Sequence, residues 1–208
     1  MSADPPDIGD PRAREVLDFW FGELKDGFAD DQHRRQWFNG GAEFDDRIRT
    51  RFSALMDTAA DGDLESWLDD PHSRLAYILV NDQLPRNLYR GEARAFARDG
   101  AALNAAKTGI DSGMDQALGP DERCFFYLPF EHSECLVDQH TCVGLFSALV
   151  ENTPDPLKRI VDDYRNFARQ HRDILQRFGR FPHRNKVLGR GSTPDEADYL
   201  KSGRTFGQ

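Results

Sequence analysis

The chain has 208 residues, of which 27 are Lys or Arg and 36 are Asp or Glu, giving a formal net charge of −9 at neutral pH. This acidic balance disfavours a general nucleic-acid binder, because neutralising phosphates requires a basic surface. Hydrophobic residues at 38% and aromatic residues at 11% can build a core, while apolar runs of about five residues fall far short of the ~20 that a membrane span needs.

The length predicts one compact unit rather than two domains joined by a linker. We expect a flexible N-terminal tail over residues 1–11 and a single helical domain over residues 12–208. The tail lacks the basic and then apolar order of a secretory signal. Cys124, Cys135 and Cys142 are odd in number and contain no CxxC pair. We therefore expect reduced thiols in a cytoplasmic protein.

Helix signals begin in the first third of the chain. Apolar residues recur every three or four positions over residues 44–59, which predicts an amphipathic helix that Gly62 ends. Asp70 and Pro71 predict the N-cap and first turn of the next helix. Residues 75–80 are apolar on every side, so this second helix is predicted to be buried.

Further helices are predicted in the second half. Apolar residues seven apart predict two buried faces, one through Phe96, Leu103 and Ile110 and one through Leu136, Val143 and Val150. Residues 164–178 carry another apolar stripe, and residues 193–196 form a capping box that contains a proline. The fold class predicted from these patterns is all-α, a bundle of about eight to ten helices with essentially no sheet.

Polar side chains gather in three segments. Asp82 extends the buried face of the helix over residues 75–80, and we expect Arg86 to pair with it. His132 and Gln139 fall on the core-facing stripe of a helix predicted to begin near Pro129. The acidic residues of the same segment share another face, which we interpret as solvated, and they are Glu131, Glu134 and Asp138.

The third segment, residues 178–185, is a turn braced by two phenylalanines and fixed by Pro182. It carries four side chains that can bind anions, namely Arg180, His183, Arg184 and Asn185. The alternative is a rigid corner whose carbonyl groups are satisfied by these donors. Residues 158–190 hold ten Lys or Arg against three Asp, and we expect most of these arginines to pair with the acidic remainder of the chain.

Familiar catalytic motifs are missing from the sequence. There is no HExxH, GxSxG or phosphate-loop motif, which disfavours the enzyme classes that depend on them. A metal site would need His132, His171 and His183 to converge with Asp82 or Glu134 from separate helices. We therefore assign no metal ligand.

Five segments together resemble a family of uncharacterised bacterial proteins, domain of unknown function 924, over nearly the whole chain. They are residues 16–22, 82–87, 127–134, 178–185 and 188–193. The resemblance implies an all-helical, tetratricopeptide-like packing and implies no activity or cofactor. This sequence departs from the family pattern at Leu84, where an aromatic residue is common, and at Glu131, where an apolar residue is frequent.

Our leading hypothesis is that three helix ends meet around a polar and aromatic pocket for a small anionic ligand bearing a phosphate or a carboxylate. The predicted catalytic residues are His132, His183 and Asp82. The predicted ligand-binding residues are Arg86, Asn87, Glu134, Arg180, Arg184 and Asn185. Hydrolysis or group transfer is the favoured chemistry, although the sequence leaves open whether the chain is an enzyme and which cofactor, if any, it uses.

Two other functions stay open at this point. One is a tetratricopeptide-like scaffold that binds a peptide or protein partner, and the other is a metal-dependent hydrolase. The 15 phenylalanines leave room for an apolar homodimer patch. Neither a nucleic-acid partner nor a membrane partner is expected.

Overall fold

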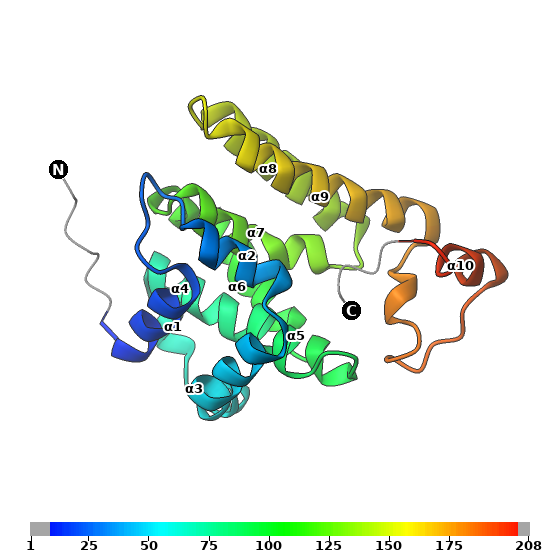
Figure 1. Cartoon of the computed structure of the whole chain (residues 1–208), viewed down its shortest axis with the longest axis horizontal. Coiled ribbons are helices and arrows are strands. Elements are labelled where there is room, and N and C mark those ends of the chain that lie inside the picture. Colours follow the sequence, from blue (N-terminus) through cyan, green and yellow to red (C-terminus); the bar gives the residue numbers. More distant parts are fainter. Residues whose placement is uncertain (1–8, 204–208) are drawn as a thin grey trace.

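Helices joined by turns and loops make up the described part of the chain, residues 9–203, in the computed structural model (Figure 1). Within this range the only β-type pairing is an isolated bridge between Lys25 and Phe28. The predicted all-α class is therefore confirmed. The α-helices are α1 (Pro11–Phe21), α2 (Asp31–Asn39), α3 (Gly41–Asp61), α4 (Pro71–Ile78), α5 (Leu84–Leu88), α6 (Asp99–Asp111), α7 (Pro120–His132), α8 (Leu136–Asn152), α9 (Lys158–Phe178) and α10 (Pro194–Tyr199).

The first helix begins inside the segment predicted as a tail. The Asp10 carboxylate caps α1 by accepting from the backbone N–H of Arg12 at 2.9 Å, and Pro11 occupies the first turn. Asp10 also accepts from the indole N–H of Trp67 at 2.9 Å. Asp10 and Pro11 are thus part of the folded structure, while residues 1–8 of the predicted tail lie outside the described residues.

Local capping chemistry set the predicted boundaries of α3, α4 and α10, and these are confirmed. Gly62 ends α3 with a φ of 88°, a left-handed conformation that a glycine adopts without strain. Asp70 accepts from the backbone N–H groups of His72 and Ser73 at the start of α4. Thr193 and Glu196 form the predicted capping box of α10.

The predicted buried faces of α6 and α8 are wrong in detail. Small residues, Ala102, Ala105, Ala106 and Gly109, form the buried face of α6, because the ring of Phe126 and the chain of Arg74 would clash with any side chain at position 109. On α8 the buried apolar residues are Cys142, Phe146, Leu149 and Val150. Leu136, at the exposed start of this helix, is 41% accessible.

A helix break near the middle of the chain was not predicted. Helix α7 ends at His132 and α8 begins at Leu136, so His132 and Gln139 lie on different helices. The amide of Gln139, fully buried, reaches back and donates to the carbonyls of Phe130 (3.2 Å), Glu131 (2.7 Å) and Ser133 (2.8 Å). This capping from a residue downstream satisfies carbonyls that the end of α7 leaves without a helical partner.

The helices are arranged around a core rich in aromatic side chains. Helices α8 and α9 lie side by side along one edge of the molecule, above α7, and α10 sits at one end (Figure 1). Trp20, Trp37, Phe21 and Phe125 contact one another edge-on in the centre. No helix in residues 9–203 combines the length and the apolarity that crossing a bilayer requires.

Candidate functional site

The site begins at an irregular turn between α4 and α5. Leu79–Gln83 forms a π-helical segment that joins the two helices without a break. Pro85 has no N–H to donate to the carbonyl four residues before it, which favours widening of the helix at this point. Single π turns are frequent at functional sites. Here the turn places Asp82 inside the protein, with no exposed surface.

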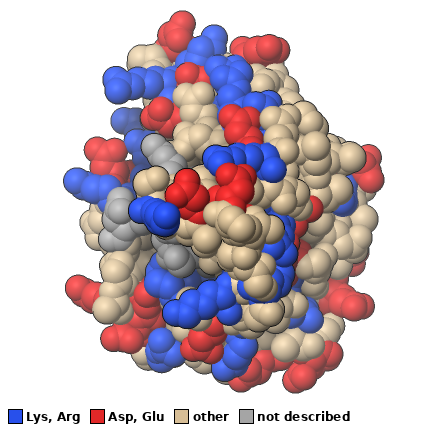
Figure 2. All heavy atoms as spheres, turned by 90° about the vertical axis from the view of Figure 1, so that its right-hand side faces the viewer, with Lys and Arg blue, Asp and Glu red and all other residues tan. Residues whose placement is uncertain are grey.

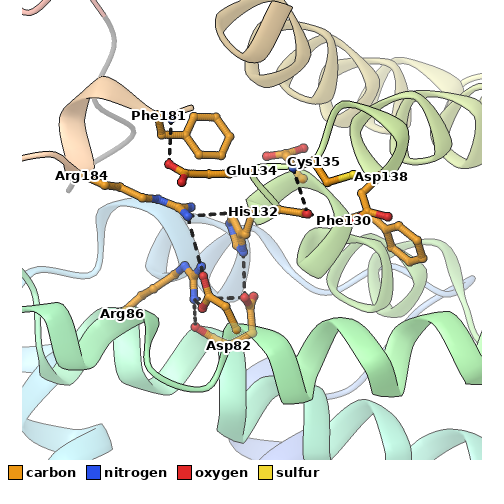
Figure 3. Close-up of polar contacts among 12 residues, drawn as sticks. Asp82, Arg86, Phe130, His132, Glu134, Cys135, Asp138, Phe181 and Arg184 are labelled. Carbon is orange, nitrogen blue, oxygen red and sulfur yellow. Dashed lines mark hydrogen bonds and ion pairs between the residues drawn. The ribbon is translucent and has the colours of Figure 1, made fainter. Parts of the chain in front are cut away.

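Asp82 is the centre of a buried network of charges (Figure 3). Its Oδ1 lies 3.0 Å from NH1 of Arg86, which confirms the predicted pair, and 2.8 Å from Nδ1 of His132. Arg86 also donates to both carboxylate oxygens of Asp99, at 2.9 Å each. Gln83 donates to Oδ2 of Asp82 at 2.5 Å. The carboxylate of Asp82 is thereby compensated by one cation and two hydrogen-bond donors.

The network shifts the pKa values of its members. Burial acts to raise the pKa of Asp82, but the positive charge of Arg86 and the contact with His132 outweigh it and hold the pKa below its ordinary value. Burial, and then the charge of Arg86, lower the pKa of His132. Asp82 is therefore ionised and His132 neutral at pH 7.

The C-terminal segment closes over this network. Arg184 donates to the backbone carbonyl of His132 at 3.0 Å. Its guanidinium lies between the rings of Phe96 and Phe181, 4.7 and 4.5 Å from their centroids. Burial, and then the charge of Arg86, lower the pKa of Arg184 to about 10, which leaves it charged at neutral pH.

Glu134 clamps the same segment to the end of α7. Its carboxylate accepts from the backbone N–H of Phe181 at 2.8 Å and from both terminal nitrogens of Arg190, at 2.6 and 2.9 Å. Burial opposes ionisation, but these hydrogen bonds from Arg190 and Phe181 lower the pKa of Glu134. A carboxylate that accepts two hydrogen bonds from one arginine and a third from a backbone N–H holds the two segments in a defined orientation.

We expect Glu134→Ala to lower the free energy of unfolding by about 2 kcal/mol, because it leaves the Phe181 N–H without its acceptor and Arg190 without its carboxylate partner. Chemical denaturation measures the change. Arg177→Ala is the control, because it removes an exposed pair with Asp195 at 2.6 Å and should cost less than ~0.5 kcal/mol. Equal effects of the two substitutions would contradict the clamp.

A cavity of about 650 Å³ lies beside the charge network. Helices α5, α7, α8 and α9 and the junction of α2 with α3 supply its walls. Its apolar and aromatic lining includes Trp37, Leu128, Phe146, Tyr164 and Phe167. Its polar lining consists of Asp45, Gln83, Arg86, Asn87, Arg90, Glu131, His132 and His171. An apolar body and a polar group could both be accommodated.

Three of the predicted site residues line this cavity, namely Arg86, Asn87 and His132. Asp82 lies behind His132, without exposed surface. Glu134 and Arg184 hold the C-terminal segment, as described above. The remaining predicted residues, His183, Arg180 and Asn185, belong to the C-terminal segment and are not part of the cavity wall.

Arg180 and Asn185 are engaged by α10 instead. Arg180 donates to both oxygens of Glu196, at 2.6 and 2.8 Å, and Asn185 donates to Ser192 at 3.1 Å and to Glu196 at 3.3 Å. The corner interpretation expected these donors to satisfy the turn's own carbonyl groups, whereas these contacts are to side chains of residues 192–196. Figure 2, which views this end of the molecule, shows basic and acidic side chains intermixed over the surface.

The predicted solvated acidic face of residues 131–138 is wrong. Glu131 is only 4% exposed and Asp138 only 5%. Asp138 pairs with Lys107 at 2.6 Å and accepts from Ser133 at 2.7 Å. Because α7 ends at His132, Glu131 and Asp138 lie on different helices. Their side chains therefore point toward neighbouring helices and do not share one exposed helix face.

The histidines of the site approach one another without forming a chelating group. The ring centroids of His132 and His171 are 6.5 Å apart, and the rings of His171 and His183 both contact the ring of Phe181. Within residues 9–203, no three His, Cys, Asp or Glu side chains are placed to hold one metal ion.

Arg90, Trp37 and Asp45 line the cavity and were not predicted as site residues. Arg90 follows α5, and Asp45 pairs with it at 3.4 Å and accepts from Asn87 at 2.8 Å. No local motif marks them, because the cavity wall forms only when the α2–α3 junction packs beside α5 and α9. Phe167 lies on the predicted apolar stripe of α9, yet it is 42% exposed and lines the cavity.

Comparison with known proteins gives a family and a fold. Residues 16–204 match the model of a family described as bacterial protein of unknown function (DUF924). A solved structure of a protein of unknown function from Agrobacterium tumefaciens is similar, with a TM-score of 0.78 and 38% sequence identity. The match covers 92% of this chain and 97% of that one. No curated protein matches the chain.

Proposed function

This chain belongs to the DUF924 family of bacterial proteins of unknown function, and from its own side chains we propose that it is an enzyme that uses His132 as a general base on a small anionic ligand. The ligand would occupy the 650 Å³ cavity. The observation that carries the proposal is the part-buried hydrogen bond of 2.8 Å between Asp82 and His132 at the wall of that cavity.

The pair of Asp82 and His132 sets the direction of proton transfer. An ionised carboxylate can only accept, so Nδ1 of His132 carries the ring proton and donates to Asp82. The lone pair of the imidazole then sits on Nε2. No side chain in the described range is hydrogen-bonded to Nε2, and His132 lines the cavity. Nε2 can therefore accept a proton from water or from a ligand hydroxyl, as hydrolysis or group transfer requires.

The anionic group of the ligand would bind at Arg90 and Asn87 rather than at Arg86. The guanidinium of Arg86 is already compensated by Asp82 and Asp99. The side chain of Arg90 is 47% exposed, and Asp45, at 3.4 Å, is one of its partners. Such an exposed pair is worth less than ~1 kcal/mol, so a carboxylate or phosphate of the ligand can replace Asp45.

The peptide-binding scaffold and the metal-dependent hydrolase rank below this function. Neither gives a role to a buried carboxylate that orients an imidazole at a cavity wall. Tetratricopeptide-like pairing of the helices stays a prediction. We place the reaction in the cytoplasm, because the cysteines of the described chain are free thiols.

A ligand screen tests the binding step. Phosphates and small carboxylates are added in a thermal-shift assay, and a ligand at about 100 times its dissociation constant should stabilise the protein by ~2.7 kcal/mol. Because Trp37 lines the cavity, the same ligand should change the intrinsic tryptophan fluorescence.

Variants decide where the ligand binds. Arg90→Met should abolish the shift, whereas Arg159→Met, which removes an exposed charge on α9, should retain it. His132→Gln should still bind the ligand but fail to turn it over. A screen in which no phosphate or carboxylate stabilises the wild-type protein would rule out the proposed function.

A further inference from the structure

Glu131 is a buried carboxyl group that has no cationic partner among residues 9–203. It lines the cavity next to His132, and its side chain is 6% exposed. Burial, and then the negative charge of Asp82, raise the pKa of Glu131 to about 8. The titratable groups of residues 9–203 that surround it include no Lys or Arg. They are His171 from α9, Asp82 from the π turn, Cys142 from α8, and Cys124 and His132 from α7 itself.

The contact with His171 does not take up the carboxyl proton. Nδ1 of His171 lies 3.0 Å from the carbonyl oxygen of Phe167 and 3.1 Å from Oε1 of Glu131. A carbonyl can only accept, so Nδ1 carries the ring proton. Burial lowers the pKa of His171 to about 3, and the ring is therefore neutral. Glu131 cannot donate to an Nδ1 that already bears hydrogen, which leaves its proton for a ligand in the cavity.

The following inference rests on the proposed function. We propose that un-ionised Glu131 donates a hydrogen bond to the carbonyl oxygen of the ligand, and that the substrates are esters or amides that carry a carboxylate and an apolar acyl group. Each part of such a molecule has a counterpart in the cavity. The apolar group meets Trp37, Leu128 and Phe167, and the carboxylate meets Arg90.

The hydrolytic step then balances with groups of this chain and water alone. His132 takes a proton from water at Nε2 as the water oxygen bonds to the carbonyl carbon, and the carbonyl π electrons move to the oxygen that Glu131 holds. When the carbonyl re-forms, the bond to the leaving oxygen or nitrogen breaks, and that atom takes the proton from His132. The products are a carboxylic acid and an alcohol or amine.

Two matched probes isolate the carbonyl group. N-benzoylglycine carries an aromatic ring, an uncharged amide carbonyl and a carboxylate. 4-Phenylbutanoate keeps the ring, the carboxylate and the spacing between them, but has methylenes in place of the amide. Binding of each to the full chain is measured by calorimetry at about pH 6.5 and about pH 9.5, on either side of the pKa of Glu131.

At the lower pH the wild-type protein should bind N-benzoylglycine about fivefold more tightly than 4-phenylbutanoate, the effect of one hydrogen bond of ~1 kcal/mol. The preference should vanish at the higher pH, where Glu131 is ionised. Glu131→Gln, whose amide donates at every pH, should show the preference at both values, and Glu131→Met at neither.

The outcomes separate this inference from the proposed function. Equal binding of the two probes, or a preference that survives in Glu131→Met, overturns the role of Glu131 and leaves the anion site and His132 in place. Binding of neither probe overturns the acyl carboxylate class, and the phosphates and carboxylates of the wider screen then decide the proposed function separately.

Discussion

Asp82→Asn should lower the free energy of unfolding at neutral pH by about 3 kcal/mol, because it removes a compensating charge from buried Arg86 while Asp99 remains. Equilibrium urea denaturation measures the loss. The substitution should also lower the pKa of His132 further, because Asp82 is the negative partner that favours the imidazolium. An NMR titration of the imidazole protons follows this second effect independently of stability.

The pH dependence of the loss has a defined sign. The pKa of Asp82 is lower in the folded than in the unfolded protein, so its stabilising contribution is present above the unfolded value of about 3.9 and fades as the pH falls below it. The stability difference between wild type and Asp82→Asn should therefore shrink in acid.

A second substitution distinguishes a lost charge pair from a packing defect. In Asp82→Asn/Arg86→Met, the buried cation that had lost one of its two carboxylate partners is gone, and Asp99 retains Arg184, whose NH1 lies 3.7 Å from it. The double variant should recover part of the lost stability. Asp173→Asn, which alters a carboxylate that is 60% exposed, is the control and should change stability by less than ~0.5 kcal/mol. A loss that Arg86→Met does not relieve would contradict this account.

Helices bounded by local chemistry were predictable from the sequence. Asp70 with Pro71, Gly62, and the capping box of Thr193 and Glu196 each act within one turn of their own helix. Their effect does not depend on the rest of the fold, so reading a few neighbouring residues was sufficient.

The break between α7 and α8 could not be predicted in the same way. No glycine lies at residues 133–135, and Pro129 lies inside α7 rather than at its start. The carbonyls at the break are satisfied by Gln139, which lies six to nine residues further on. The helical spacing of residues 132–143 therefore suggested one continuous stripe, and it misplaced Glu131 and Asp138 on a solvated face.

The sequence was sufficient to predict that residues 82, 132 and 184 lie close together. It was not sufficient to predict which of their side chains face the cavity. Buried polar residues near helix ends indicate that those ends come together, and the hydrogen bonds from His132 to Asp82 and from Arg184 to His132 show that they do. Arg180 and Arg184 carried the same signal in the sequence. Only packing against α10 or against Phe96 and Phe181 decides what each guanidinium contacts.

Glu131→Gln should stabilise the protein, and by an amount that grows with pH. In the unfolded chain Glu131 ionises near its ordinary pKa, whereas in the folded protein it keeps its proton up to about pH 8. Between these two values the unfolded state binds fewer protons than the folded state, so the stability of the wild type falls as the pH rises. Glutamine has no proton to lose, and the variant escapes this fall.

Above pH 8 the free energy of unfolding of Glu131→Gln should exceed that of the wild type by about 3 kcal/mol. This value follows from a pKa shift of a few units, each worth ~1.4 kcal/mol. Denaturation curves at about pH 4.5, 7 and 9 measure it in the absence of any ligand. Glu151→Gln, an exposed site on α8, is the matched control and should show no such trend. If the stability of Glu131→Gln ran parallel to the wild type from pH 4.5 to pH 9, Glu131 would be ionised at neutral pH, and it could not donate a hydrogen bond to a ligand carbonyl.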